Sequence, residues 1–251
     1  MILIKTAKEI DRLRKGGAIL ANILHKVIAR VKPGITTQEL NSYAEELIRQ
    51  NNAQPSFKNY QNFPASLCTS VNEQIVHAIP RPKVVLKRGD IIGLDLGIWY
   101  EGKCTDMART VPVGAISVQA KKLIRITNKA LDRGIEQVKP GRKVGDISAT
   151  IQTIAESNDY SVVRTLFGHG VGRKVHEEPR IPNFGKPNTG PILKPGMVLA
   201  IEPMLTLGQP QVQTASDGWS IATVDGSLTA HAEDTIAVTD EGYEVLTKYN
   251  G

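Results

Sequence analysis

Two short motifs occur twice in this chain at one shared spacing, and this repetition limits the folds that the chain can adopt. The motif VKPG at 31–34 recurs at 138–141, and LKRG at 86–89 recurs as LKPG at 193–196. Each second copy lies 107 residues after the first. The shared offset indicates an internal duplication.

The length of the chain bounds the number of domains. At 251 residues, 41% of them apolar, the chain can bury one substantial core. Two similar halves within that length predict one pseudo-symmetric domain rather than two independent ones. We therefore expect a single domain, residues 1–251, with halves at about 1–110 and 111–251.

Each half reads as a helix, a Pro-Gly turn, a second helix and then strands. Apolar residues at three- and four-residue spacing predict an amphipathic helix within 8–31. Thr36 followed by Glu39 is a capping box that begins a second helix, ending near residue 49. The second half repeats this order, with one helix after Ser117 and another at about 144–156.

Short segments rich in Val, Ile and Thr predict strands. Hairpins between them favour a mainly antiparallel sheet with the helices on one face, which is an α+β fold. Two proline-rich segments, 52–56 and 179–187, predict loops. The predicted strands lie at about 67–71, 75–79, 90–97, 104–112, 162–166, 197–206, 219–224 and 233–239.

The composition argues against several classes of protein. Lys and Arg number 31 against 25 Asp and Glu, a net charge of +6, without the signatures of a nucleic-acid-binding domain. Cys68 and Cys104 do not make a secreted disulfide framework. Charges at Lys5 and Glu9 interrupt any signal core, and no segment approaches a membrane span. We expect a cytoplasmic protein with no membrane partner and no specific nucleic-acid partner.

Four acids occur in paired strand settings. Asp95 and Asp106 lie in two β-type runs, and a four-residue loop between these runs would place them directly opposite each other. The 107-residue offset makes Glu202 the counterpart of Asp95, and Glu233 begins the last strand as Asp106 begins its own run. Four clustered buried carboxylates need cations to neutralise them, which predicts two divalent metal ions. Alternatively, one aspartate caps a turn or pairs with Arg109.

Three of the five histidines point to a reactive site. His169 lies in FGHGVG, where the flanking glycines let backbone approach closely and leave the imidazole free to reach a ligand. His77 and His176 occupy matching Val-His-x-x-Pro motifs, and each is either a structural histidine or a donor to substrate. His25 falls in the first helix and is expected to pack there or face solvent, and His231 is left without a role.

These residues, in this order, closely resemble the type I methionine aminopeptidases. The resemblance covers nearly the whole chain and implies the pita-bread fold, whose two pseudo-symmetric halves agree with the duplication. It implies removal of the initiator methionine from nascent proteins, with a preference for a small second residue. The motifs that carry it are GHGVG at 168–172, HEEP at 176–179 and AIEPM at 200–204, together with Asp95, Asp106 and Glu233.

The resemblance also implies a dinuclear site that holds Co, Mn, Fe(II) or similar ions. Asp106 and Glu233 would bridge the metals, Asp95 would bind one of them, and His169 and Glu202 would bind the other. Glu202 would also move the proton of the attacking water.

Roles in substrate binding follow from the same resemblance. His77 and His176 would contact the substrate amide and the tetrahedral intermediate, and His77 would assist the leaving nitrogen. The methionine side chain would lie among apolar residues that match the pocket of the family: Tyr60, Phe63, Cys68 and Trp219.

The chain departs from the pattern of the family at four positions. Ala78 follows His77 where glycine is usual, and Val175 replaces a frequent aromatic residue. Gly93 and Asp234 stand where many relatives have Asn and His, so the tuning of the metals is expected to differ.

Two alternative functions share part of this pattern. A proline-directed relative of the same fold, an aminopeptidase P or a prolidase, would share the ligands but usually carries a further amino-terminal domain. A non-catalytic member that binds RNA or nascent chains would typically lose ligands. We expect a monomer, and transient association with ribosomes is a hypothesis that the positive charge and a nascent-chain substrate suggest.

Overall fold

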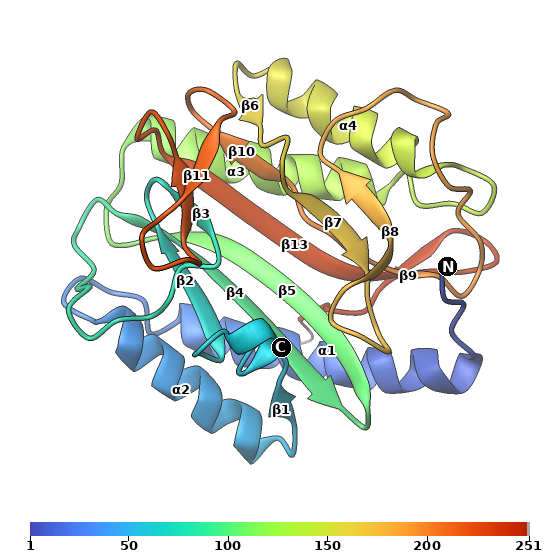
Figure 1. Cartoon of the computed structure of the whole chain (residues 1–251), viewed down its shortest axis with the longest axis horizontal. Helices are drawn as coiled ribbons and strands as arrows, with labels where there is room; N and C mark the ends of the chain where they lie inside the picture. Colours follow the sequence, from blue (N-terminus) through green and yellow to red (C-terminus); the bar gives the residue numbers. More distant parts are fainter. Residues whose placement is uncertain (250–251) are drawn as a thin grey trace.

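The computed structural model describes residues 1–249, in which four α-helices pack against a large antiparallel sheet (Figure 1). Helices α1 and α2 lie along the strands of the first half, and α3 and α4 lie along those of the second half. A 3-10 turn at Tyr60–Asn62 is the remaining helical element of the described residues. The helices are α1 Ala7–Ile28, α2 Thr37–Gln50, α3 Val118–Ile135 and α4 Val144–Glu156.

All strand pairs of the described residues are antiparallel, which confirms the predicted fold class. The main path of the large sheet runs β1-β4-β5-β13-β9-β7-β8, and a second, small sheet runs β11-β12-β3. The strands are β1 Gln54–Pro55, β2 Leu67–Val71, β3 Gln74–Val76, β4 Ile91–Tyr100, β5 Lys103–Pro112, β6 Ser161–Val162, β7 Phe167–Gly170, β8 Glu177–Pro182, β9 Val198–Ile201, β10 Met204–Thr206, β11 Val212–Thr214, β12 Ile221–Thr223, β13 Thr229–Val238 and β14 Tyr243–Val245.

The helices begin where the sequence predicts. Thr36 accepts a hydrogen bond from the Glu39 backbone N–H, and the Glu39 carboxylate accepts one from the Thr36 N–H, so the predicted capping box is present. Ser117 caps α3 through a bond from Ala120 N–H. Helix α1 ends at Ile28, ahead of Pro33, which cannot continue a helix.

The strands alternate between a helix-facing side and a second side that carries the polar residues. In β4, Leu94 and Leu96 belong to the core cluster under α1 and α2, whereas Asp95 points to the opposite face. In β13, Ile236 packs in the cluster under α3 and α4, whereas Glu233 points away from it. The helices therefore cover one face of the sheet, and the acids gather on the other.

The duplication read from the sequence has a structural counterpart. Isolated β-bridges join Thr36 to Val85 and Lys143 to Ile192, which are equivalent pairs at the 107-residue offset. The hydrogen bonds beside them, Gly34 N–H to Leu86 O at 2.8 Å and Gly141 N–H to Leu193 O at 3.0 Å, are equivalent as well. These contacts support the proposed division into two similar halves.

The predicted strands need several corrections. The predicted segment 197–206 is two strands, because Glu202 and Pro203 separate β9 from β10. The segments 75–79 and 162–166 are shorter than expected, and β13 begins at Thr229 rather than at residue 233. Strands β1, β11 and β14 were not predicted.

Three segments that read as turn or loop are strands of the large sheet, and the first of them is β1, which lies within the predicted loop 52–56 and pairs with β4. Strand β7 contains Gly168 and Gly170, where a Cβ would collide with backbone oxygens of Ala200 and Glu178. The glycines thus permit close strand packing rather than a flexible turn. Strand β8 overlaps the proline-rich segment 179–187, and it tolerates proline because it is the last strand on its side of the sheet.

Two smaller expectations concern the cysteines and the membrane. Cys68 and Cys104 are both buried free thiols, as expected for a chain without a disulfide framework. Among the helices of residues 1–249, none is both long enough and apolar enough to cross a membrane.

Candidate active site

The hairpin of β4 and β5 places two of the four acids, but in a register different from the prediction. Asp95 pairs with Ala108 and Asp106 pairs with Gly97, so the two aspartates are not directly opposite. The connecting turn has two residues, Glu101 and Gly102, with φ of 46° and 71°. Positive φ at both positions is typical of the type I′ turn, which fits the twist of a hairpin.

The corrected register still brings the aspartates together. A shift of two residues preserves the face on which a side chain lies, because the side-chain period of a strand is two. Asp95 and Asp106 therefore lie diagonally on the same face and both line one cavity of about 110 Å³. All the residues proposed from the sequence line this cavity: Tyr60, Phe63, Cys68, His77, Asp95, Asp106, His169, His176, Glu202, Trp219 and Glu233.

Four carboxylates share the cavity, and its lining contains no lysine or arginine among the described residues. Burial raises the pKa of Asp106 to about 7. Burial, followed by repulsion from neighbouring carboxylates, also raises the pKa of Asp95, Glu202 and Glu233 well above the usual range. Without a positive charge, the cavity cannot hold all four groups ionised at neutral pH.

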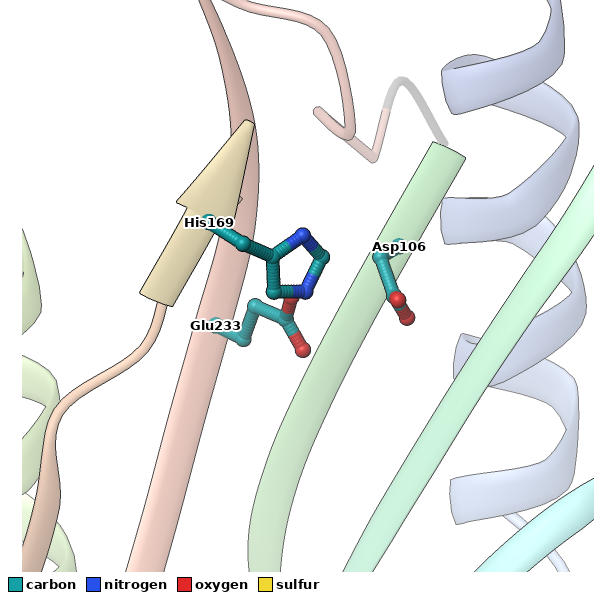
Figure 2. Close-up of side chains that lie close together, drawn as sticks. All are labelled: Asp106, His169 and Glu233. Carbon is teal, nitrogen blue, oxygen red and sulfur yellow. The ribbon is translucent and has the colours of Figure 1, made fainter. Parts of the chain in front are cut away.

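Three donors lie close enough to share a cation. Asp106, His169 and Glu233 each offer an atom within 4.8 Å of the others, and Figure 2 shows their side chains converging from β5, β7 and β13. The Nδ1–H of His169 donates to the carbonyl of Gly170 at 2.9 Å, assigned from this contact, which leaves Nε2 as an acceptor toward the cavity. This tautomer is the one that metal-binding histidines adopt.

Two further observations show that the group fits a divalent cation. Asp95 Oδ1 and Glu233 Oε1 are buried without a hydrogen-bond partner, although buried polar atoms are normally paired. Carboxylate oxygens and one imidazole nitrogen suit Mn, Fe(II), Co or similar ions. The alternative pairing of Asp95 or Asp106 with Arg109 is not found, because the guanidinium of Arg109 bonds to the carboxylate of Asp234 at 2.8 Å and to the backbone carbonyls of Ala108 and Glu233.

His77 is held in an unusual backbone conformation beside the acids. Its φ is 59°, in the left-handed region that few non-glycine residues adopt, and such outliers often occur at functional sites. Burial, followed by the charge of His176, lowers the pKa of His77 to about 4. His77 is therefore a neutral imidazole at physiological pH.

His176 faces the same cavity through two contacts. Its Nδ1 lies 3.0 Å from the Tyr60 hydroxyl, which makes a hydrogen bond between them. Its ring lies edge-on to that of His169, with 4.4 Å between the ring centroids. Burial lowers the pKa of His176 as well.

An apolar wall completes the cavity. The rings of Phe63 and Trp219 pack edge-on, with 5.1 Å between the ring centroids, and Cys68 belongs to the same buried cluster. Burial, with the nearby acids, raises the pKa of the Cys68 thiol well above its usual value, so Cys68 contributes an uncharged surface. Three lining residues were not proposed from the sequence, because none carries a chemical signal of its own: Phe57, Gln61 and Val76.

A larger cleft of about 700 Å³ adjoins the cavity and shares His77, His169, His176 and Glu202 with it. The cleft extends past residues that lie outside the cavity, among them Met1, Leu3, Phe167, Lys174, Glu177, Glu178, Arg180 and Met204. A polypeptide whose first residue occupies the cavity therefore has a path for the residues that follow.

The four departures from the pattern of the family have different surroundings. Asp234 lies beside Arg109, and its carboxylate also accepts a bond from Thr247 at 2.7 Å. Gly93 has room for a Cβ, which would meet Ser70 and Thr110 at 3.6 Å. Ala78 and Val175 are buried apolar residues, and their effect on the cavity stays a prediction.

Comparison with known proteins agrees with the geometry. A model of metallopeptidase family M24 matches residues 11–240. The chain is 50% identical to a methionine aminopeptidase of Clostridium perfringens, over 98% of this chain and 99% of that protein. The crystal structure of methionine aminopeptidase from Rickettsia prowazekii has a TM-score of 0.97 at 42% identity and covers 99% of this chain and 100% of that chain. A prolidase from Pyrococcus horikoshii has a TM-score of 0.81 at 26% identity, covering 100% of this chain and 65% of that one.

Proposed function

The chain belongs to metallopeptidase family M24 and to its methionine aminopeptidases, and from this membership we propose that it hydrolyses the bond after an N-terminal methionine. One observation carries the proposal. A group of buried acids and histidines and an apolar wall line the same cavity, so one side chain can bind beside the groups that would cleave its peptide bond.

The family implies the use of a divalent metal, and this chain has residues suited to hold it. We propose that Asp106 and Glu233 would be ligands shared by two ions, that Asp95 would hold one of them, and that His169 and Glu202 would hold the other. Divalent cations in such a site supply a Lewis acid and make water nucleophilic at neutral pH. The donor set suits Mn, Co, Fe(II) or similar ions, and activity with each metal distinguishes them.

The catalytic side chains act on protons and on the substrate amide. Glu202 accepts a proton from the attacking water and passes it toward the leaving nitrogen. Its suitability rests on burial, which makes its carboxylate a stronger base than a solvated one. His77 and His176 are neutral donors to the amide, and the contact between Tyr60 and His176 supports a fixed orientation of the His176 ring.

The methionine side chain occupies the apolar end of the cavity. Phe63, Cys68 and Trp219 supply uncharged walls there, and Tyr60 closes the side next to His176. The second residue of the substrate then lies toward the adjoining cleft. A small side chain at that position is expected from the resemblance to the family.

Two alternative functions have less support. The prolidase likeness is lower in identity and leaves about a third of that protein unmatched, whereas the methionine aminopeptidases match along their full length. A non-catalytic binding role is disfavoured because all five proposed ligands are present and line one cavity.

The decisive experiment measures methionine release from Met-Ala-Ser and Met-Ile-Ser, with Ala-Pro-Ala as the control. Metals are stripped first, and Mn(II), Co(II) or Fe(II) is then added back. We expect metal-dependent cleavage of Met-Ala-Ser alone. Cleavage of only Ala-Pro-Ala would move the assignment to the proline-directed branch, and no cleavage with any metal would favour the non-catalytic role.

The remaining proposals concern the setting of the enzyme. We propose that it acts in the cytoplasm as a monomer on the N-terminal methionine of nascent polypeptides, and that it associates transiently with ribosomes. The net charge of +6 motivates the last of these. Salt-sensitive cosedimentation with ribosomes would support it, and absence of cosedimentation at low salt would remove it.

A further inference from the structure

His231 is a histidine of the site to which the proposed mechanism gives no task. It lies in β13 two residues before Glu233, so both side chains point to the same face of the sheet. Its side chain is buried, at 3% exposed. The hydroxyl of Thr110 fixes its backbone, because it accepts from the His231 N–H and donates to the His231 carbonyl, each at 2.8 Å. The imidazole therefore projects from a rigid point.

The Nε2 of His231 is buried and has no hydrogen-bond partner, yet it faces two carboxylates. It lies 3.7 Å from Glu202 Oε2 and 3.9 Å from Glu233 Oε2. Both distances exceed those of a hydrogen bond, but a shift of about 1 Å in either carboxylate would form one. An unpaired buried polar atom is costly, so the direction of Nε2 toward the acids calls for an explanation.

The two oxygens of Glu202 face different histidines. Oε1 lies 3.5 Å from His169 Nε2, whereas Oε2 lies 3.7 Å from His231 Nε2. The donors that lie within 4.8 Å of one another include His169 but not His231. A cation held by that group would thus lie on the His169 side of Glu202, and Oε2 would be left facing His231.

Glu202 needs such a partner because the sheet does not fix it. It follows the end of β9 and precedes Pro203, so it has no partner residue in a strand ladder. Asp95, its counterpart at the 107-residue offset, is paired on both sides within the sheet. The orientation of the Glu202 carboxylate must therefore come from side-chain contacts.

We propose that His231 is a positioning residue whose Nε2–H would donate to Oε2 of Glu202 in the metal-loaded enzyme, so that Oε1 would be the oxygen left facing the metal. The proposal rests on the function proposed above. It assigns His231 to orienting a ligand, which is distinct from binding a metal itself and from contacting substrate.

The test compares His231→Leu with His231→Gln in the full chain, with Mn(II) alone as the probe. Calorimetric titration of the metal-free protein gives the dissociation constant. His231→Leu removes the donor and should weaken Mn(II) binding by about 10- to 100-fold, the usual effect of losing a partner of a metal ligand. His231→Gln keeps an N–H of similar reach and should stay within about threefold of wild type.

A matched control removes a histidine far from the cavity. His25 is in α1 and stacks on Tyr249, so His25→Leu should leave the Mn(II) dissociation constant unchanged. Thermal unfolding of the metal-free variants checks their folding. Should His231→Leu not fold, His231→Asn replaces it, because its shorter amide does not reach Glu202.

Three results would overturn the proposal. Equal weakening in the Leu and Gln variants would mean that the imidazole only fills space, and unchanged affinity in His231→Leu would leave it without a role. Loss of an imidazole nitrogen from bound Mn(II) by pulsed EPR in His231→Leu would make His231 a direct ligand. Because Mn(II) binding is read without peptide, wild-type protein that binds Mn(II) but releases no methionine would count only against the proposed function.

Discussion

The two halves of the molecule share a scaffold but treat their equivalent acids differently. In the first half, Asp95 lies within β4, where its backbone faces Cys68 of β2 on one side and Ala108 of β5 on the other. In the second half, its counterpart Glu202 lies just beyond β9 and next to Pro203. The sheet therefore fixes the backbone of Asp95, whereas the backbone of Glu202 lies outside the strand pairing.

The connections between strands explain this difference. Strands β4 and β5 are joined by a two-residue turn, so the hairpin continues past Asp95 to its tip. Their equivalents β9 and β13 are joined by residues 202–228, which include β10, β11 and β12. The long connection ends β9 early, and it also brings Trp219 to the cavity. A duplicated scaffold thus positions both acids, while an asymmetric connection gives one of them more freedom.

The largest expected effect comes from exchanging the two counterpart acids for amides. Glu202→Gln should lower kcat by about 10²- to 10⁴-fold even with saturating metal, because the proposed proton acceptor is lost. Asp95→Asn should first weaken metal binding, so that added Mn(II) recovers part of the activity. Methionine release from Met-Ala-Ser across a series of Mn(II) concentrations separates the two. Identical metal dependence in both variants would break the distinction between the halves.

A second prediction concerns the histidines, which do not follow the 107-residue offset. His77→Asn should reduce kcat by about 10²-fold or more, since asparagine tolerates the positive φ but cannot replace the imidazole. His77→Ala should lose similar activity and also about 1 kcal/mol of stability from backbone strain. Peptide turnover and urea unfolding measure the two effects. Full activity of His77→Asn in a metal-replete assay would refute the assigned role.

The third prediction concerns pH, because both halves contribute acids whose pKa is raised. In the metal-free protein, burial raises the pKa of Asp106 to about 7, so the ionised form that binds metal predominates only above that pH. Metal affinity should therefore fall as pH falls below about 7, by about tenfold per pH unit for each proton displaced. His169 adds no proton in this range, because burial lowers its pKa to about 3.

Titrations with Mn(II) between about pH 5 and pH 8, in buffers of different ionisation enthalpy, measure both the affinity and the protons released. An affinity that does not change with pH would contradict the burial of the acids.

The fourth prediction compares equivalent glycines of the two halves. Gly34 and Gly141 have φ of 92° and 85°, and a Cβ added to either glycine would meet no atom within 4 Å. Replacement of either one by alanine should cost about 1–2 kcal/mol through backbone strain alone. Equal shifts of the urea midpoint in the two variants would support the equivalence of the halves, and clearly unequal shifts would show that the halves differ in local stability.

The smallest expected effect concerns helix caps. Thr36 caps α2 with its hydroxyl, whereas Lys143 holds the equivalent position before α4 and has no side-chain oxygen to accept a bond. Thr36→Ala should cost about 1 kcal/mol, and Lys143→Thr should stabilise by up to about 1 kcal/mol. Chemical unfolding measures both changes. No gain from Lys143→Thr would mean that the carboxylate of Asp146, which already accepts from the Lys143 N–H, suffices at this end.

The sequence predicted the helices better than the strands for a local reason. Helix ends depend on nearby residues, such as Thr36 with Glu39, and these signals lie within four positions. Strands β7 and β8 were missed because their membership in the sheet depends on partners far along the chain. The glycines of β7 fit under Ala200 and Glu178, which no local pattern could reveal.

The prediction of the candidate site from the sequence had a similar limit, because only residues with a signal in the sequence could be named. The acids and histidines could be named because each carries a chemical signal and a place in the repeat or in a recognised motif. The predicted register of Asp95 and Asp106 is wrong by two residues, because the prediction assumes a four-residue loop where the chain makes a two-residue turn at Glu101 and Gly102. Phe57, Gln61 and Val76 line the cavity without any such signal.

The sequence by itself determined the duplication, the fold class and the set of chemical groups, because these are written in spacing and residue type. Only the tertiary structure decided which oxygens and nitrogens face one another. His231 shows this difference. It has no counterpart in the repeated motifs of the sequence, yet its Nε2 lies 3.7 Å from Oε2 of Glu202, a residue 29 positions earlier in the chain. Such contacts depend on the register and twist of paired strands, and these are fixed by packing over the whole domain.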